Sequence, residues 1–551
     1  MLKISNIKLP IGHDQHVLFL ALLKKVKVLK LVANDITKMQ IFKRSLDARK
    51  KDKIHYVYQI LISCKDEQKF VKRLLRQPVK DVELYQEAER SKLVVGSTPM
   101  NYRPVVVGTG PAGLMAGILL AEHGFRPLVF ERGRDVDQRQ RDIEEFWRSG
   151  VLQPESNVQF GEGGAGTFSD GKLTTRIHNT RIDDVYRILK EAGAPEEIAY
   201  VHKPHIGTDQ LRIVVKNLRK RLLQLGGEVL FDHKVIDIDI ADNQVRGVVV
   251  QSQGESRQVA TNHVVLAIGH SARDTFAMLH DKHVHMEPKA LAIGVRIEHP
   301  QMVINQAQYG VCAEGTIYKD LGPAEYQLVS KQPDDRKRTV YTFCMCPGGQ
   351  VVAAASEAGG VVTNGMSYHA RDLENANAAL VVTVEPQDYG YEIGKSPLLG
   401  VEYLRKWERK AYLVGGSNYY APVQLVKDFL ACRPTVHVGG NSVQPTYLPG
   451  VTPADLHDCL PGYVTDAMKA AIVEFGGKLN GFDMGEAVMT GVETRTSSPI
   501  RIVRDEFAES VNCKGLYPTG EGAGYAGGII SAAVDGLKVA EWLIQKHAPC
   551  T

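Results

Sequence analysis

The sequence predicts an α/β protein built around a Rossmann-like, doubly wound parallel sheet. Short β-branched runs alternate with helical runs from residue 103 to residue 274, beginning with Val105–Val107, Ala112–His123 and Pro127–Phe130. A glycine-rich turn joins the first of these strands to the first helix. The segment 491–551 repeats the order of strand, glycine-rich turn and long helix. We therefore expect the segments 103–274 and 491–551 to form one domain.

Two further units are predicted on either side of this first segment. Residues 1–95 contain 21 Lys and Arg and 10 Asp and Glu, a net charge of +11, so the rest of the chain carries −7 of the overall +4. Such a shift in charge indicates a separate N-terminal module. Residues 275–490 contain more strands and broken Gly/Pro segments, which predicts a mixed α+β substrate or cap domain.

The N-terminal module is predicted to be a small α+β unit. Leu2–Leu9 alternates like a strand, and Asp14 can cap a helix over His16–Val26. Ile54–Ser63 is rich in β-branched and aromatic residues, as a strand would be. The basic run 43–51 before it has two interpretations: a solvated hairpin or loop, or a contact surface for RNA or an acidic partner. The run carries no stacking aromatic pattern that would favour RNA.

The glycine-rich turn has the spacing of a dinucleotide site. In Gly108-Thr109-Gly110-Pro111-Ala112-Gly113 the first glycine makes a tight turn, the second lets the backbone approach a phosphate, and the third lets the helix pack close to the strand. The N-terminus of the helix then offers free N–H groups to a pyrophosphate. Glu131 ends the next strand 18 residues after Gly113, where an acid can hold ribose hydroxyls.

The turn alone does not distinguish FAD from NAD, but distant segments do, because a long extended cofactor touches many loops. The stretch 160–172 holds five glycines in 13 residues. Its bare N–H groups can lie beside a flavin ring or its phosphates, although an ordinary flexible loop has the same composition. The strand 227–238 and the turn 264–269 look like the adenine-side strand and turn of two-dinucleotide-fold flavoproteins, with Ile268 where Thr is usual.

The C-terminal segment Gly515–Ala523 looks like a flavin motif in which a strand ends at Gly-Asp. In that motif the acid holds the ribityl chain, and the N-terminus of the next helix faces the O2/N1 edge of the flavin. Glu521 stands where Asp is usual; it is one methylene longer but accepts the same hydrogen bonds. The glycine-rich loop 160–172 and this C-terminal segment therefore require the same long cofactor.

These motifs resemble the glutathione-reductase-type FAD-dependent oxidoreductases and, more closely, a bacterial family of uncharacterised FAD-dependent dehydrogenases. The segments that carry the resemblance are Phe160–Leu173, Cys344–Gly349, Asn364–Ser367, Glu493–Pro499 and Gly520–Gly528. The resemblance implies that the chain is an oxidoreductase with FAD as its cofactor. The residues that we expect to bind FAD are Gly108, Gly110, Pro111, Ala112, Gly113, Glu131, Arg132, Gly163, Gly164, Gly166, Ser169, Lys172, Val235, Gly269, Gly520, Glu521, Gly528 and Ile529.

The expected reaction is hydride transfer between a small-molecule substrate and flavin N5. No second GxGxxG turn occurs between residues 230 and 490, so no dedicated NAD(P)H domain is expected, although NAD(P)H is a candidate external reductant. No CxxxxC pair occurs either, which argues against disulfide reductase chemistry.

Three residues are candidates for catalysis. Lys172 ends the glycine-rich stretch and can stabilise a reduced, anionic flavin, unless it is an ordinary loop lysine. Arg495 can hold a substrate carboxylate with two hydrogen bonds, unless it lies on a surface strand. Tyr525 can donate a proton or pack over the ring, and packing is the favoured interpretation.

The CxC pair Cys344 and Cys346 is unusual. One thiol can lie in the site, or both can bind a metal with outside histidines, but no histidine has zinc spacing. Buried structural cysteines are the favoured interpretation, and no metal site is predicted. The eight cysteines are scattered, no signal peptide is recognisable and no apolar run reaches about 18 residues, so we expect a cytoplasmic protein without a membrane partner.

Two alternatives to the small-molecule oxidoreductase are open. The first is an RNA-modifying flavoprotein that holds RNA with its basic N-terminal module. The second is a flavin-binding electron-transfer partner without its own substrate, although the long middle region would then have no role.

Overall fold

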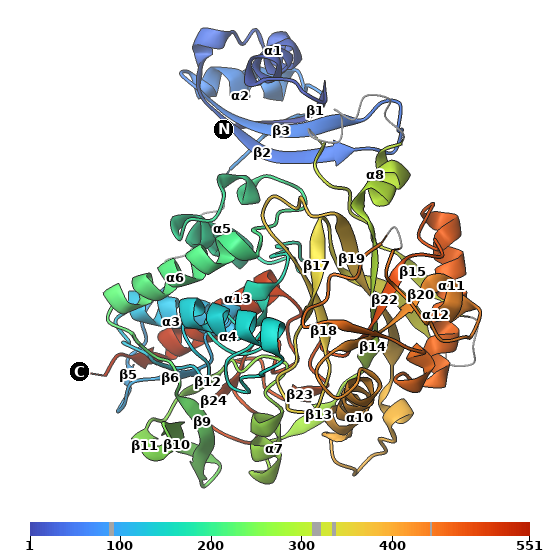
Figure 1. Cartoon of the computed structure of the whole chain (residues 1–551). Coiled ribbons are helices and arrows are strands. Elements are labelled where there is room, and N and C mark those ends of the chain that lie inside the picture. The colour runs from blue at the N-terminus through green and yellow to red at the C-terminus, as the bar shows by residue number, and fades with distance from the viewer. Residues whose placement is uncertain (87–92, 311–320, 333–337, 441–442, 551) are drawn as a thin grey trace.

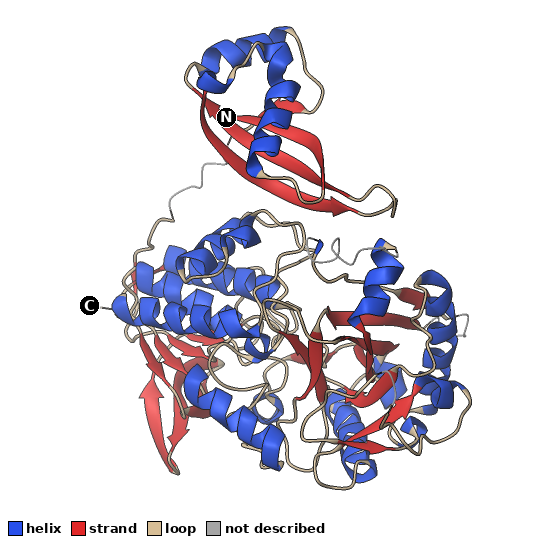
Figure 2. Cartoon of the chain, turned by 45° about the horizontal axis from the view of Figure 1, so that its top comes forward, coloured by secondary structure: helices blue, strands red, loops and turns tan. Residues whose placement is uncertain are grey.

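The computed structural model describes residues 1–86, 93–310, 321–332, 338–440 and 443–550. Three sheets dominate these residues. Figure 1 shows the N-terminal sheet at the top, a parallel sheet at the lower left and a large, mainly antiparallel sheet at the lower right. Figure 2 shows that helices pack against each of the three. This is the predicted α/β architecture of a Rossmann-like domain with additional sheet and helix domains.

The parallel sheet joins two segments that are far apart in the sequence. Its strand order is β24-β12-β6-β7-β8, and all neighbours run parallel. The C-terminal strand β24 (Leu516–Pro518) pairs with β12 (Val264–Leu266), so the two segments share one sheet. The remaining strands are β6 (Val105–Val107), β7 (Leu128–Phe130) and β8 (Glu228–Leu230).

Both faces of the parallel sheet are covered, which explains why its strands are apolar throughout rather than alternating. On one face Val106 and Val265 pack among helices, and on the other Val105 and Val264 pack among strands of a three-stranded antiparallel sheet. The elements that cover the sheet are α3 (Pro111–Glu122), α5 (Arg181–Glu191), α6 (Thr208–Gln224), α13 (Ile529–Lys546), β9 (Lys234–Ala241), β10 (Gln244–Ser252) and α7 (Arg273–Asp281). The third strand of the small sheet is β11 (Glu255–Ala260), and α4 (Val136–Ser149) precedes the glycine-rich loop.

The large sheet has the strand order β15-β16-β19-β14-β22-β20-β21. Its neighbours are antiparallel except for β20 and β21. Its strands are β14 (Leu291–Pro300), β15 (Val329–Lys331), β16 (Thr339–Cys346), β19 (Asn375–Val384), β20 (Ala421–Leu425), β21 (Val451–Pro453) and β22 (Val488–Glu493). The hairpin β17 (Gly349–Ala353) and β18 (Thr363–Ser367), the strands β13 (Met286–Pro288) and β23 (Ile500–Ile502), and the helices α8 (Gln301–Tyr309), α10 (Leu399–Val414), α11 (Val426–Leu430) and α12 (Gly462–Lys478) accompany it.

The N-terminal module is a four-stranded antiparallel sheet with two helices. The side chain of Asp14 accepts a hydrogen bond from Val17 N at 2.8 Å and so caps α1, as predicted. The basic run 43–51 lies in the β2–β3 hairpin. There Arg44 N donates to the Tyr200 carbonyl at 2.7 Å, which ties the module to the rest of the chain. The elements are β1 (Leu2–Pro10), α1 (Gln15–Val26), β2 (Ile36–Asp47), β3 (His55–Cys64), α2 (Glu67–Arg76) and β4 (Val82–Leu84).

We keep the division into 1–95, 103–274, 275–490 and 491–551 as a proposal that the three sheets support, with β22 crossing the last boundary. Among the described residues, no helix combines the length and the apolar character needed to cross a membrane.

Candidate functional site

A large cavity begins at the carboxyl edge of the parallel sheet and continues to the large sheet. Its volume is about 1170 Å³, above the range of about 300–1,000 Å³ common for small-ligand pockets. The carboxyl edge is where doubly wound sheets bind dinucleotides. Most of the predicted cofactor residues line the cavity: Gly108, Gly110, Pro111, Ala112, Glu131, Arg132, Gly164, Gly166, Ser169, Lys172, Val235, Gly269, Glu521, Gly528 and Ile529.

The turn after β6 has the geometry that its three glycines predict. Gly108 has a φ of +103°, and a Cβ there would lie 2.4 Å from the Ala267 carbonyl oxygen. A Cβ on Gly113 would lie 2.0 Å from the Gly108 carbonyl oxygen, so this glycine packs behind the turn and not in the cavity. Gly110 is the N-cap of α3, and the nearest atom to its Cβ position is Gly164 Cα at 3.9 Å. The first turn of α3 therefore faces open space, as phosphate binding requires.

Glu131 organises this turn from the adjacent strand. Its carboxylate accepts hydrogen bonds from Thr109 N at 2.9 Å and Thr109 Oγ1 at 2.7 Å. It also accepts from the N–H groups of Gly133 and Gly161, both at 3.0 Å. Sequence reasoning predicted a ribose contact for this acid; the structure adds a second task, which is to join the glycine-rich turn to the glycine-rich loop.

Arg132 lies in an ion-pair network on the same side of the cavity. Its guanidinium donates to Asp274 at 2.8 and 2.9 Å and to Glu155 at 2.6 Å, and Lys234 pairs with the same two acids. Its carbon Cζ lies 4.1 Å from the centre of the Phe160 ring. Because both carboxylates pair with it, Arg132 forms a rigid wall of the cavity. Val235, which follows Lys234 along β9, lines the cavity as well.

The glycine-rich loop is held by a buried arginine that the sequence reasoning missed. Arg139 in α4 has no exposed surface, and its guanidinium donates to five backbone carbonyls. The acceptors are Asn157 (2.9 Å), Val158 (3.0 Å), Gly161 (3.2 Å), Glu162 (2.6 Å) and Gly164 (3.0 Å). Burial lowers the pKa of Arg139 to about 10, so the side chain stays charged at neutral pH. The loop is thus a fixed wall rather than a flexible connection.

Of two further predicted cofactor residues in the loop, Ser169 lines the cavity and Gly163 does not. Ser169 Oγ donates to the Gly166 carbonyl at 2.6 Å and accepts from Gly171 N at 3.0 Å, which closes the end of the loop. Gly163 N donates to the Thr109 carbonyl at 2.9 Å, and a Cβ on this glycine would lie 2.1 Å from Thr167 Oγ1. Gly163 therefore supports the loop from behind the cavity.

The C-terminal motif brings a second helix N-terminus to the cavity. Gly528 has a φ of +121° and is the N-cap of α13. Gly520, with a φ of +74°, lies behind the cavity and donates its N–H to Asp535 at 2.7 Å. Arg504 pairs with the same Asp535 and so fixes this turn. The N-termini of α3 and α13 both face the cavity and favour negative charge there.

Glu521 lies between these helix ends. Burial raises its pKa to about 7, against the lowering effects of the Gly528 N–H and the Lys289 ammonium. The raised pKa means that the folded chain binds a proton here more tightly than the unfolded chain does. The stabilisation from this proton is complete below about pH 4.5 and disappears as the pH rises through about 7.

We therefore expect Glu521→Gln to stabilise the cofactor-free protein at pH 8 relative to the wild type, and by less at pH 5, because glutamine has no carboxylate to desolvate. Thermal unfolding between pH 5 and pH 8.5 measures the difference. Glu255→Gln, on the exposed strand β11, is the matched control and should leave the unfolding temperature unchanged at every pH. A difference in unfolding temperature between the wild type and Glu521→Gln that does not change with pH would contradict the raised pKa of Glu521.

The three catalytic candidates all line the cavity but differ in their surroundings. Lys172 Nζ lies 3.6 Å from Glu325, a loose ion pair that leaves the ammonium available to the cavity. Arg495 donates to Glu408 at 2.9 and 3.1 Å and to Ser356 at 3.3 Å. The guanidinium is therefore already engaged, and a carboxylate clamp for substrate finds no support.

Tyr525 lines the cavity and packs against Arg504, while its packing over the flavin ring stays a prediction. Arg504 Cζ lies 3.9 Å from the centre of its ring, and the hydroxyl accepts from Arg504 N at 3.2 Å. The hydroxyl thus lies beside the backbone of Arg504, next to β23.

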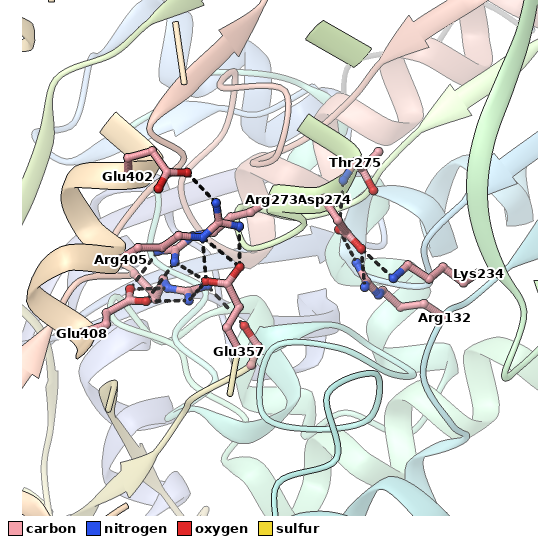
Figure 3. A network of polar contacts seen from close by, with 11 residues as sticks. Arg132, Lys234, Arg273, Asp274, Thr275, Glu357, Glu402, Arg405 and Glu408 are labelled. Carbon is pink, nitrogen blue, oxygen red and sulfur yellow. Dashed lines mark hydrogen bonds and ion pairs between the residues drawn. The ribbon is translucent and has the colours of Figure 1, made fainter. Parts of the chain in front are cut away.

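A buried ion-pair network joins the parallel-sheet domain to the large-sheet domain. Figure 3 shows that Arg273 and Asp274, at the start of α7, belong to two separate groups of contacts. Arg273 pairs with Glu408 and Glu357 at 2.8 and 2.6 Å, whereas Asp274 pairs with Arg132 at 2.8 Å. Adjacent residues thus tie α7 to both walls of the cavity, a role that no sequence pattern indicated.

The cysteine pair lies at the same cavity. Cys344 and Met345 line it, while Cys346 is buried. The seven cysteines that the structure describes are free thiols. Among the described residues no group of three or more His, Cys, Asp or Glu side chains is arranged to hold a metal ion.

Comparisons with known proteins agree with this geometry. Residues 102–297 match the family described as pyridine nucleotide-disulphide oxidoreductase, and residues 290–496 match the family described as FAD-dependent protein, C-terminal domain-like. Residues 1–63 match a domain of unknown function. The chain thus carries the domains of FAD-dependent oxidoreductases, and FAD is its cofactor.

A protein of Clostridium beijerinckii, described as uncharacterized, is 49% identical over 545 residues, which is 99% of each chain. This chain belongs to the same family as that protein. A thiamine thiazole synthase of Aeropyrum pernix is 28% identical over 179 residues, which cover 30% of this chain and 54% of the synthase.

Solved structures are similar at the level of the fold. A flavin-dependent brominase covers 81% of this chain and 80% of its own, with 13% identity and a TM-score of 0.36. A flavocytochrome c3 fumarate reductase covers 82% and 78%, with 11% identity and a TM-score of 0.34. We draw no functional argument from likenesses this distant.

Proposed function

We propose that this protein transfers a hydride between a small-molecule substrate and the N5 atom of FAD. The observation that carries the proposal is that the cavity is continuous from the glycine-rich turn, past Glu521, to β16 of the large sheet. Bound FAD supplies the hydride chemistry, while the protein orients the reactants and tunes the charge around them. A carrier of electrons without its own substrate would not need the part of the cavity beyond Glu521.

The described residues fit FAD in an extended arrangement. The N–H groups at the start of α3 would hold the pyrophosphate, because Gly110 leaves open space there. Glu131 would hold the adenosine ribose, and Glu521 would hold the ribityl chain. Gly528 and Ile529, at the start of α13, would face the flavin edge that becomes negative on reduction. These contacts support the proposal that the FAD domain is of the glutathione-reductase type.

The remaining part of the cavity is suited to an anionic substrate. Lys172, Arg176 and Lys203 line it, together with the acids Glu325 and Glu493 and the ring of Tyr341. Lys172 and Lys203 lie 3.6 and 3.7 Å from Glu325, which also pairs with Arg371 at 2.8 Å, and Glu493 is paired with Arg296. A substrate carboxylate or phosphate entering this part would neutralise the remaining positive charge of these side chains.

Of the residues first considered for catalysis, we propose only Lys172 for a direct role. Its ammonium would stabilise negative charge on substrate or on the reduced cofactor. Arg495 and Tyr525 are positioning residues in this proposal, because Glu408 and Arg504 engage them. We retain NAD(P)H as a candidate external reductant and propose a cytoplasmic location, which the free thiols support. No observation favours an RNA substrate.

The test is anaerobic reduction of the purified protein. We expect a yellow protein whose flavin absorbance is bleached by one member of a panel of NADH, NADPH and small carboxylates or phosphates. The bleaching rate should fall in Lys172→Met and remain unchanged in Lys220→Met, a lysine on α6 outside the cavity lining. Equal rates with charged compounds and their neutral amides would contradict an anionic substrate.

A further inference from the structure

The strand that carries the CxC pair is irregular at that pair. In the pairing of β16 with β19, Phe343 lies opposite Ala379 and Cys346 lies opposite Asn377, so one extra residue is inserted between them. Cys344 itself has a φ of +44°, which is uncommon for a residue with a side chain. β-Bulges of this kind re-aim a side chain and are frequent next to active sites.

The bulge brings the two thiols together at the cavity. The thiol of Cys346 is hydrogen-bonded to the sulfur of Cys344, and Cys346 Sγ also lies 3.3 Å from the Cys344 carbonyl oxygen. Cys344 lines the cavity, whereas Cys346 has no exposed surface. A ligand in the cavity therefore reaches Cys344 directly and Cys346 only through Cys344.

The charges around the pair favour a thiolate on Cys344. The hydrogen bond from Cys346 and the positive charges of Arg296 and Lys172 lower the pKa of Cys344, against its burial and the negative charge of Asp170. The same interaction and burial raise the pKa of Cys346. A thiolate that lines a cavity next to a buried thiol is the arrangement of an attacking and a resolving cysteine.

The pair also faces the proposed flavin end of the cavity. Glu521 and Cys344 both line the cavity, and the thiolate contributes to the raised pKa of the Glu521 carboxyl. Glu493, which pairs with Arg296 at 2.9 Å, is affected in the same way. The cysteine pair and the cofactor motif, more than 170 residues apart in the sequence, therefore meet at one place.

We propose that Cys344 and Cys346 form a redox-active dithiol that exchanges an electron pair with FAD bound in the cavity. In the oxidising direction the S–H bond of Cys346 breaks and one S–S bond forms between Cys346 and the Cys344 thiolate. The two electrons and the one proton released pass to oxidised FAD, which becomes anionic reduced FAD. The reverse direction returns them from reduced FAD to the disulfide. The absence of a CxxxxC pair argued against disulfide reductase chemistry, but the bulge brings the two cysteines of the CxC pair together at the cavity.

Reductive titration of the FAD-loaded full-length protein tests this proposal. After oxidation in air, anaerobic dithionite should deliver four electrons per chain to the wild type, two to the flavin and two to the disulfide. Cys344→Ser and Cys346→Ser should accept two. The matched control Cys432→Ser, an exposed cysteine outside the cavity, should accept four. Two electrons in the wild type would overturn the proposal, whether or not a substrate for hydride transfer is known.

Mass spectrometry of the wild type decides the matter if the variants do not fold. Protein oxidised in air should resist N-ethylmaleimide at Cys344 and Cys346, and the peptide containing both should be lighter by two hydrogens. After reduction by dithiothreitol the same peptide should take up two labels, with Cys344 labelled first because it lines the cavity. Full labelling of both cysteines before reduction would contradict the proposal.

Discussion

Replacement of Glu408 by alanine is expected to lower the free energy of unfolding by about 3–5 kcal/mol, the cost of removing one partner from a buried ion-pair network. Glu408 is 2% exposed and accepts hydrogen bonds from Arg273, Arg495 and Thr494. The two arginines are 3% and 5% exposed, so neither can turn to water when the carboxylate is removed. Both the joint between the domains and the wall of the cavity depend on this one carboxylate.

Urea unfolding followed by tryptophan fluorescence measures the effect, since Trp407 is the neighbour of Glu408 in α10. The matched control is Glu402→Ala in the same helix. The Glu402 side chain is 59% exposed and pairs with Arg405 three residues away, so its removal should change the free energy of unfolding by less than about 1 kcal/mol. Equal effects of the two substitutions would show that the buried network does not stabilise the domain joint.

Replacement of Gly110 by valine is expected to weaken FAD binding at least about 100-fold, or about 2.7 kcal/mol. The φ of Gly110 is −67°, which any residue adopts, and its Cβ position is open. The backbone therefore tolerates the substitution. The added methyl groups instead occupy the space between α3 and the glycine-rich loop, where the pyrophosphate is proposed to lie.

Calorimetric titration of the cofactor-free protein with FAD measures this loss. Gly477→Val is the control, because Gly477 is an exposed glycine in α12 with no atom within 4 Å of its Cβ position. Both variants should keep the wild-type circular dichroism spectrum. Unchanged FAD affinity in Gly110→Val would place the pyrophosphate away from the start of α3.

The local elements of the FAD domain were predictable because their signals are local. The strand Val105–Val107 was predicted with the bounds that it has, and the helix predicted over Ala112–His123 begins one residue earlier and ends one residue earlier. The large sheet was not predictable in its order, because β14 pairs with β19 and with β22, strands that lie far along the chain. Such pairings depend on tertiary packing rather than on periodicity.

The residues that support the site were harder to predict than those that line it. The spacing of the glycines predicted where the cofactor cavity lies, whereas Arg139 was not predicted. Arg139 lies on the apolar face of α4, at helical spacing from Val136, Ile143 and Phe146. A charged residue on an apolar face is a signal that sequence reasoning can use. The partnership of Glu408 with Arg273 has no such signal, since the two residues lie 135 positions apart.

A crystal structure of the purified protein with its cofactor tests the central claim most directly. We expect FAD with its pyrophosphate against the N–H groups at the start of α3 and its ribityl chain beside Glu521. The flavin ring should lie next to Cys344, with open cavity remaining toward Lys172. A pyrophosphate bound elsewhere, or a flavin ring that closes off the part of the cavity beside Lys172, would contradict it.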